Sequence, residues 1–172
     1  MTKRITTLIF IFALCSFLSA CASKKKDPSN FSLDTEIIAS NDINLDNEGS
    51  ASPVSFIIYQ LSDNESFIAA DYNSLVLEPQ SPFSDAIVSK KQYQIQPGKR
   101  AVVTIDVSPE TRYIGVAGAF REAKTSRNKN WASIIDLPKK IAKKKSKLQS
   151  KIFLSGNKID VVIVKSGRLS FN

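Results

Sequence analysis

Alternating apolar and polar residues recur along the chain and predict short β-strands. The alternation is clearest at residues 31–38 and 100–107, where an apolar side chain stands at nearly every second position. The run 54–61 is β-branched and aromatic almost throughout, which is typical of a buried strand. Further strands are expected at 92–96, 112–120, 131–137, 151–154 and 158–164. With one or two helical turns around 71–76, the pattern predicts a mainly β protein, an antiparallel β-sandwich of about seven or eight strands with one short helix.

Turn-forming residues separate these strands. Pro97-Gly98 lies between two alternating segments and predicts a hairpin, and Ser155-Gly156-Asn157 predicts a second one. The longest separator, Ser40 to Pro53, is rich in Asn, Asp and Ser and is expected to be a long loop. Loops of this length in a compact domain are usually either functional or disordered.

The first twenty residues follow another pattern. Lys3 and Arg4 form a short basic region, and the apolar segment 5–18 follows. This order predicts a secretory signal peptide and not a membrane-spanning helix, which needs about 20 apolar residues. Leu18-Ser19-Ala20-Cys21 then resembles the bacterial lipobox, which implies cleavage before Cys21 and acylation, typically with palmitate, of that cysteine. The alternative is a plain signal peptide with a cysteine nearby.

The domain organisation follows from these segments. Residues 1–20 are the expected lipoprotein signal peptide, 21–30 a lipid-anchored tether, 31–165 the β-sandwich domain and 166–172 a C-terminal tail. Ala22 stands where an Asp commonly retains Gram-negative lipoproteins at the inner membrane, so by analogy the outer membrane is expected, with the domain facing the periplasm.

Composition argues against enzyme classes. The 172 residues include no histidine, which removes Ser-His-Asp and Cys-His nucleophiles and every metal site that needs imidazole. Both cysteines, Cys15 and Cys21, lie near the N-terminus, so a disulfide framework is not expected. Asp42, Asp46 and Glu48 do not match a calcium-binding EF-hand loop. We therefore expect no catalytic residues, no metal and no cofactor.

Charge is divided unevenly along the chain. The formal net charge is +8, but residues 21–120 carry 8 basic and 13 acidic side chains, whereas 121–172 carry 14 basic and 3 acidic ones. A lysine cluster accounts for much of the excess: Lys139, Lys140, Lys143, Lys144 and Lys145. These lysines could contact an anionic membrane or an acidic partner, or form a solvated loop. Nucleic acid is not expected, because no aromatic residue interleaves the cluster.

Several short motifs, in consistent order over about 31–165, resemble one known family. They are Asn44-Leu45-Asp46, Gly49, Ser52-Pro53, Ile58-Tyr59-Gln60-Leu61, Ala70-Asp71-Tyr72, Pro97-Gly98, Tyr113-Ile114-Gly115-Val116-Ala117, Ala119-Phe120-Arg121 and Trp131. Together with the lipobox, they resemble the outer-membrane lipoprotein of the bacterial type VI secretion system, the TssJ or SciN family.

The resemblance implies a transthyretin-like sandwich with a protruding loop between its first two strands. In that family the lipoprotein tethers the secretion membrane complex to the outer membrane, and the loop binds the periplasmic C-terminal domain of the inner-membrane subunit TssM. By position the loop is Ser40 to Pro53, and its expected partner-binding residues are Asn41, Asp42, Ile43, Asn44, Leu45 and Asp46. No small-molecule substrate is expected.

Two questions stay open from the residues alone. Ile43 and Leu45 are apolar residues in a polar loop, so they either bury against a partner or pack back on the sandwich. The fold also suits a different function, a periplasmic module that binds a small or glycan ligand. Phe120 and Trp131 are expected in the core, and Arg121 is either an ion-pair partner or exposed.

Overall fold

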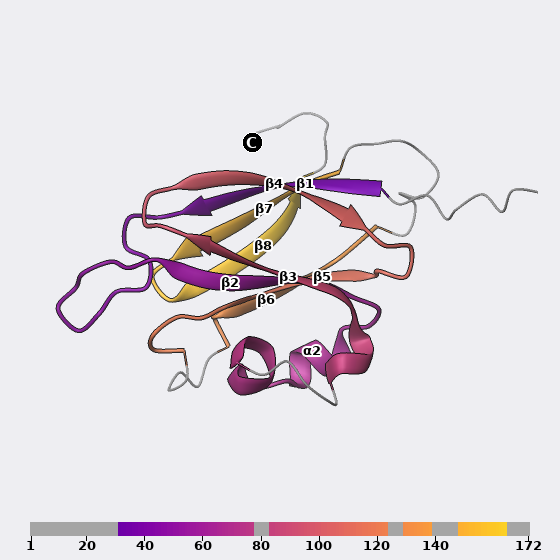
Figure 1. Cartoon of the computed structure of the whole chain (residues 1–172), viewed down its shortest axis with the longest axis horizontal. Coiled ribbons are helices and arrows are strands. Elements are labelled where there is room, and N and C mark those ends of the chain that lie inside the picture. The colour runs from indigo at the N-terminus through magenta and orange to yellow at the C-terminus, as the bar shows by residue number, and fades with distance from the viewer. Residues whose placement is uncertain (1–30, 78–82, 124–128, 139–147, 165–172) are drawn as a thin grey trace, which may run out of the picture.

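Two four-stranded sheets pack face to face in the computed structural model, which describes residues 31–77, 83–123, 129–138 and 148–164 (Figure 1). One sheet has the strand order β4-β1-β7-β8 and the other the order β3-β2-β5-β6. The strands are β1 (Phe31–Ala39), β2 (Val54–Leu61), β3 (Ile87–Ile95), β4 (Arg100–Val107), β5 (Tyr113–Gly118), β6 (Ala132–Asp136), β7 (Leu148–Ser155) and β8 (Lys158–Val164). The mainly β sandwich expected from the sequence is confirmed, with eight strands in the described part of the chain.

The alternation located most strands well, because it reports that one face of each strand is buried. Strands β2 and β4 begin and end at the residues expected. Strands β3 and β7 begin earlier than expected, at Ile87 and at Leu148. The early part of β3 is largely exposed on both faces, so it shows no alternation of apolar residues that could reveal it.

The pairing of the strands departs from the expectation in two places. Strand β7 runs parallel to β1, whereas all other pairs are antiparallel. The hairpin predicted at Pro97-Gly98 is wrong: β3 pairs with β2 and β4 pairs with β1, so this turn carries the chain from one sheet to the other. The hairpin at Gly156 is confirmed, because it joins the antiparallel pair β7 and β8.

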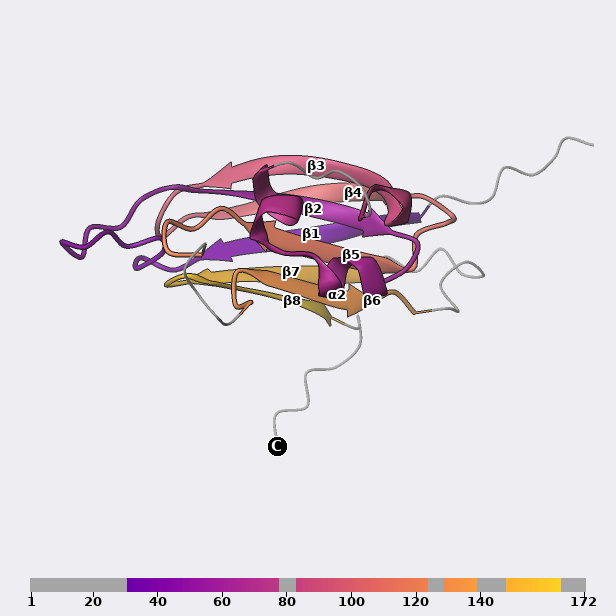
Figure 2. The ribbon, with the colours of Figure 1, turned by 90° about the horizontal axis from the view of Figure 1, so that it is seen from below.

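Short helical turns cover the outer face of the β3-β2-β5-β6 sheet (Figures 1 and 2). They are α2 (Glu65–Ala69), the π-helical turn η2 (Asn73–Leu77) and the 3-10 turn η3 (Phe83–Ala86). The predicted helical turns at 71–76 correspond to η2, but α2 was not predicted. Its position depends on tertiary packing: the rings of Phe67, Tyr59 and Phe83 lie 5.2–5.9 Å apart over the sheet.

A glycine on β5 permits this close packing. A Cβ atom at Gly115 would lie 2.7 Å from the ring of Phe67, closer than side chains pack. On the same sheet face, the Tyr59 hydroxyl donates a hydrogen bond to the Leu75 carbonyl and so fixes η2. The expected core residues Phe120 and Trp131 are indeed buried.

Several sequence predictions lie outside the described residues. These are the signal peptide, Cys21, the tether, the lysines at 139–145 and the tail after residue 165. Within the ranges that the structure describes, no helix has the length and apolar character needed to cross a membrane.

Candidate partner-binding loop

The loop 40–53 projects beyond one end of the sandwich, where β1 ends and β2 begins (Figures 1 and 2). Its base is held by the two turns at the same end. The N–H of Gly98 donates to the carbonyl of Ser40 over 3.0 Å, and the N–H of Asn44 donates to the carbonyl of Gly156 over 2.9 Å. Gly98 has a φ of +69°, and a Cβ atom there would overlap the side-chain oxygen of Asn41. The loop base is therefore part of the folded domain.

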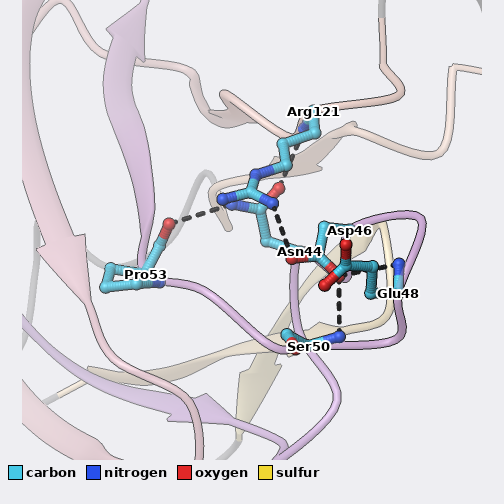
Figure 3. A network of polar contacts seen from close by, with 6 residues as sticks. All are labelled: Asn44, Asp46, Glu48, Ser50, Pro53 and Arg121. Atoms are coloured by element: carbon cyan, nitrogen blue, oxygen red, sulfur yellow. Dashed lines mark hydrogen bonds and ion pairs between the residues drawn. The ribbon is translucent and has the colours of Figure 1, made fainter.

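Asn44 fixes the path of the loop (Figure 3). It is buried and has a φ of +52°, a backbone conformation that Asn adopts more readily than most residues. Its side-chain Nδ2 donates to the carbonyl of Pro53 over 2.9 Å, and its Oδ1 accepts from the N–H of Arg121 over 2.8 Å. One side chain thus joins the start of the loop to its end and to the segment after β5.

Asp46 orders the tip of the loop (Figure 3). Its Oδ1 accepts from the N–H groups of Ser50 (2.8 Å) and Glu48 (3.0 Å), and its Oδ2 lies 3.3 Å from a guanidinium nitrogen of Arg121. The N–H of Ser50 lowers the pKa of Asp46 most, and Glu48 N–H and the charge of Arg121 act in the same direction. The tip is closed by a hydrogen bond from Gly49, with a φ of +80°, to the Asp46 carbonyl.

The structure separates the predicted loop residues into two groups. Ile43 is fully buried in the core, so of the two possibilities raised by the sequence, it packs back on the sandwich. Asn44 is also buried, and its side chain is used within the protein. Asn41 and Asp42 are exposed, and Leu45 and Asp46 are half-buried. Ile43 and Asn44 therefore shape the loop from within the folded domain, and the exposed side chains among the six predicted contact residues are those of Asn41 and Asp42.

The sequence prediction stopped short of the most exposed part of the loop. Asn47, Glu48, Gly49, Ser50 and Ala51 are all exposed at its tip. The signal was Gly49, since Asp46 followed three residues later by Gly is a turn pattern. The sequence does not reveal that Arg121, 75 positions further along the chain, neutralises part of the charge of Asp46.

The loop presents negative charge at neutral pH. Residues 40–53 contain Asp42, Asp46 and Glu48 and no lysine or arginine. Hydrogen bonds from the Ser40 hydroxyl and the Gly156 N–H lower the pKa of Asp42. A partner surface that complements this loop would be basic.

No group of three or more His, Cys, Asp or Glu side chains that could hold a metal ion occurs in the described ranges. Lys151, at the end of the basic stretch, lies on β7, where its ammonium is 2.9 Å from a carboxylate oxygen of Glu36.

In the part of the chain that the structure describes, the arrangement at the loop is suited to recognition: an ordered projection with exposed polar groups and a rigid base.

A β-sandwich with an ordered loop projecting from one end defines the structural class of this protein. The family model described as Type VI secretion lipoprotein (VasD, EvfM, TssJ) matches residues 32–157. The chain therefore belongs to the type VI secretion lipoprotein family, whose members are structural components of the secretion system and not enzymes.

Solved structures agree with this assignment. The type VI lipoprotein TssJ1 of Pseudomonas aeruginosa is 21% identical, with a TM-score of 0.69 over 81% of this chain and 100% of that one. A chain of a type VI membrane complex is 25% identical, with a TM-score of 0.64 over 80% and 100%. A chain of a structure described as the TssM C-terminal domain from EAEC is 27% identical, with a TM-score of 0.59 over 76% and 99%. No curated protein matches the chain in sequence.

Proposed function

We propose that this lipoprotein is anchored in the outer membrane through Cys21 and binds the periplasmic C-terminal domain of TssM through the tip of the loop 40–53. In this role it tethers the inner-membrane part of the type VI complex to the outer membrane. The family assignment supports a place in the membrane complex. One chain similar to this protein is found in a structure described as the TssM C-terminal domain, and this similarity supports TssM as the partner.

One observation carries the choice of the loop as the contact. The Asp46 carboxylate accepts hydrogen bonds from the N–H groups of Glu48 and Ser50, and residues 47–50 are exposed in the loop that projects beyond the sandwich. A loop that is ordered before binding loses less conformational entropy on binding, so more of the contact energy appears as affinity.

The test is binding of the purified protein to the periplasmic C-terminal domain of TssM from the same bacterium, by biolayer interferometry. Glu48 is exposed at the tip, so Glu48→Lys reverses a charge that points away from the domain. We expect it to weaken binding by about tenfold or more, which is one unfavourable charge contact of roughly 1.4 kcal/mol.

Glu65→Lys is the matched control. It makes the same change of charge on α2, which covers the outer face of the β3-β2-β5-β6 sheet and not the loop. It should change the affinity less than about twofold. Equal affinity of Glu48→Lys and the unmodified protein would refute the assignment of the loop. Replacement of the whole segment 41–48 is a poorer test, because it removes the buried side chains of Ile43 and Asn44 and so perturbs the fold.

The anchor has a separate test. Metabolic labelling with a palmitate analogue should label the protein, and Cys21→Ser should abolish both the label and recovery of the protein in the outer-membrane fraction. Labelling that persists in the Cys21→Ser variant would exclude this cysteine as the anchor.

A further inference from the structure

The two long sides of the sandwich are built differently. On one side the edge strand β8 is bonded to the opposite sheet: the N–H of Ile159 donates to the Asn130 carbonyl over 2.8 Å, and the N–H of Val161 donates to Ser133 Oγ over 3.2 Å. On the other side β3 and β4 are the outermost strands of their sheets. A cavity of about 210 Å³ lies between them. We call this space the β3–β4 seam; its walls are Ser89, Lys91 and Tyr93 on β3 and Thr104, Ile105 and Asp106 on β4.

The edge of β4 presents backbone groups to this seam. In an antiparallel pair, successive residues point their N–H and C=O groups alternately toward and away from the partner strand. The N–H of Ala39 donates to the carbonyl of Lys99, so Lys99 directs its backbone groups toward β1. Every second residue after it, namely Ala101, Val103 and Ile105, therefore also bonds to β1. Arg100, Val102, Thr104 and Asp106 therefore direct their N–H and C=O groups away from β1.

Gln60 confirms this phase and marks where the free edge ends. Its Nε2 donates to the carbonyl of Asp106 and its Oε1 accepts from the N–H of Ser108, each over 2.9 Å. One side-chain amide thus makes the two bonds that a residue of an added strand would make. Gln60 comes from the opposite sheet and occupies the edge at 106–108. Among the residues that the structure describes, the N–H and C=O groups of Arg100, Val102 and Thr104 are therefore left for a further strand.

The seam also has a place for side chains. Ile58 and Ile105 form an apolar floor. An engineered cavity of about 150 Å³ accepts benzene, so the larger volume here accommodates a branched aliphatic side chain. Lys91 stands at the rim, exposed, with its ammonium 5.5 Å from the ring centre of Tyr93, and that ring stacks on Phe56.

We propose that the β3–β4 seam binds an extended segment of another protein, which adds to the edge of β4 as a strand. The segment places an aliphatic side chain over Ile58 and Ile105 and a carboxylate, on the same face of the strand, beside Lys91. Such addition of a strand to a free sheet edge is a general mode of peptide recognition. The charges favour a different protein over a second copy of this chain, because two copies would bring two sets of Lys90, Lys91 and Lys99 together.

The seam lies along the side of the sandwich and uses none of the side chains of the loop tip, so this proposal does not depend on the binding of TssM. A variant that loses binding of the peptide at the seam but keeps binding of TssM, or the reverse, therefore separates the two proposals.

The test uses the full-length protein in detergent and a blocked heptapeptide as the probe. The peptide has Leu at its centre, Glu two residues to either side on the same strand face, and Thr elsewhere. Amide hydrogen exchange, followed by NMR, should slow at Val102 and Thr104 when the peptide binds. Val103 is the internal control, because its N–H is already bonded to β1 and should not change.

Variants separate the backbone contact from the charge contact. Val102→Pro removes an outward N–H and no hydrogen bond to β1, a position at which an edge strand tolerates proline. Lys91→Glu reverses the charge at the rim. Each should weaken binding about tenfold, and Lys91→Glu should recover affinity for the peptide with Lys in place of Glu. Lys90→Glu is the matched control, since its side chain points to the opposite face of β3, and should change the affinity less than about twofold.

Three results would overturn the proposal. One is the absence of peptide binding at about 1 mM, a concentration that corresponds to only about 4 kcal/mol of binding free energy. Another is an equal loss of binding in Lys90→Glu and Lys91→Glu. The third is concentration-dependent dimerisation that Val102→Pro abolishes, which would assign the seam to a second copy. If Val102→Pro does not fold, the comparison of Lys91→Glu with Lys90→Glu decides the question alone.

Discussion

Replacement of Asn44 by alanine tests how the loop is held. The change removes the Nδ2 donor to Pro53 and the Oδ1 acceptor for Arg121, two bonds of 2.9 and 2.8 Å, while the backbone keeps its φ of +52°. The bond to Pro53 closes the loop over 9 residues, and the bond to Arg121 joins segments 77 residues apart in the sequence.

The magnitude follows from these contacts. Two hydrogen bonds contribute about 0.5–1.5 kcal/mol each to stability, and their loss leaves a carbonyl and an N–H without this partner. The left-handed conformation costs a residue such as alanine roughly 1–2 kcal/mol, and less for asparagine. We therefore expect Asn44→Ala to lower the free energy of unfolding by about 2–4 kcal/mol, a large part of the total stability of a domain of this size.

Urea unfolding followed by tryptophan fluorescence measures this change, because Trp131 is buried in the core. Two further variants divide the effect. Asn44→Gly loses both bonds but relieves the backbone strain, so it should be about 1 kcal/mol more stable than Asn44→Ala. Asn44→Asp keeps an acceptor for Arg121 but loses the donor to Pro53.

A change of less than about 0.5 kcal/mol in Asn44→Ala would refute this reasoning, since that is the ordinary range of a surface substitution. Equal stability of the alanine and glycine variants would refute the backbone part of the argument alone. At temperatures where Asn44→Ala stays folded, its affinity for the TssM domain should also fall, because the loop loses its fixed path.

Three other predictions concern the fold. Gly115→Ala places a methyl group 2.7 Å from the Phe67 ring, so α2 must shift and the melting temperature should fall by on the order of 5 °C in calorimetry; an unchanged value would contradict the packing described. The pKa of Asp46 is lower in the folded state than its ordinary value of 3.8, so its contribution to stability is full above that value and is lost as the pH falls through the lower folded pKa. Urea unfolding from pH 5 to pH 2 should therefore show a shallower decline in Asp46→Asn, and parallel curves would exclude the effect. Lys129 Nζ donates to the carbonyls of Phe67 (2.7 Å) and Ala70, so Lys129→Met should speed amide exchange at Ala70, whereas the exposed control Lys158→Met should not.

The sequence predicted the loop better than it predicted the roles within it. The polar composition of 40–53 gave its position and length correctly, because turn residues act locally. The burial of Ile43 was one of two alternatives, since an apolar residue in a loop packs on whichever surface lies beneath it. The loop on either side of Ile43 is held by backbone hydrogen bonds from Ser40 to Leu154 and from Asn44 to Gly156, more than a hundred residues later in the chain.

What the sequence by itself determined is local or is carried by motifs. Alternation reports that one face of a strand is buried, and this located β4 at both ends; the run of β-branched and aromatic residues located β2. The order of short motifs indicated the family, which the match over residues 32–157 then showed.

Only the tertiary structure decided which strands are neighbours. Burial of one face does not specify the strand that lies beside it, so the turn at Pro97-Gly98 could join two strands of one sheet or cross between two sheets. The same limit applies to Arg121, which reaches Asp46 and Asn44 because β5 lies next to β2. The ordered loop and the open β3–β4 seam both result from contacts between distant segments, which no local pattern of residues encodes.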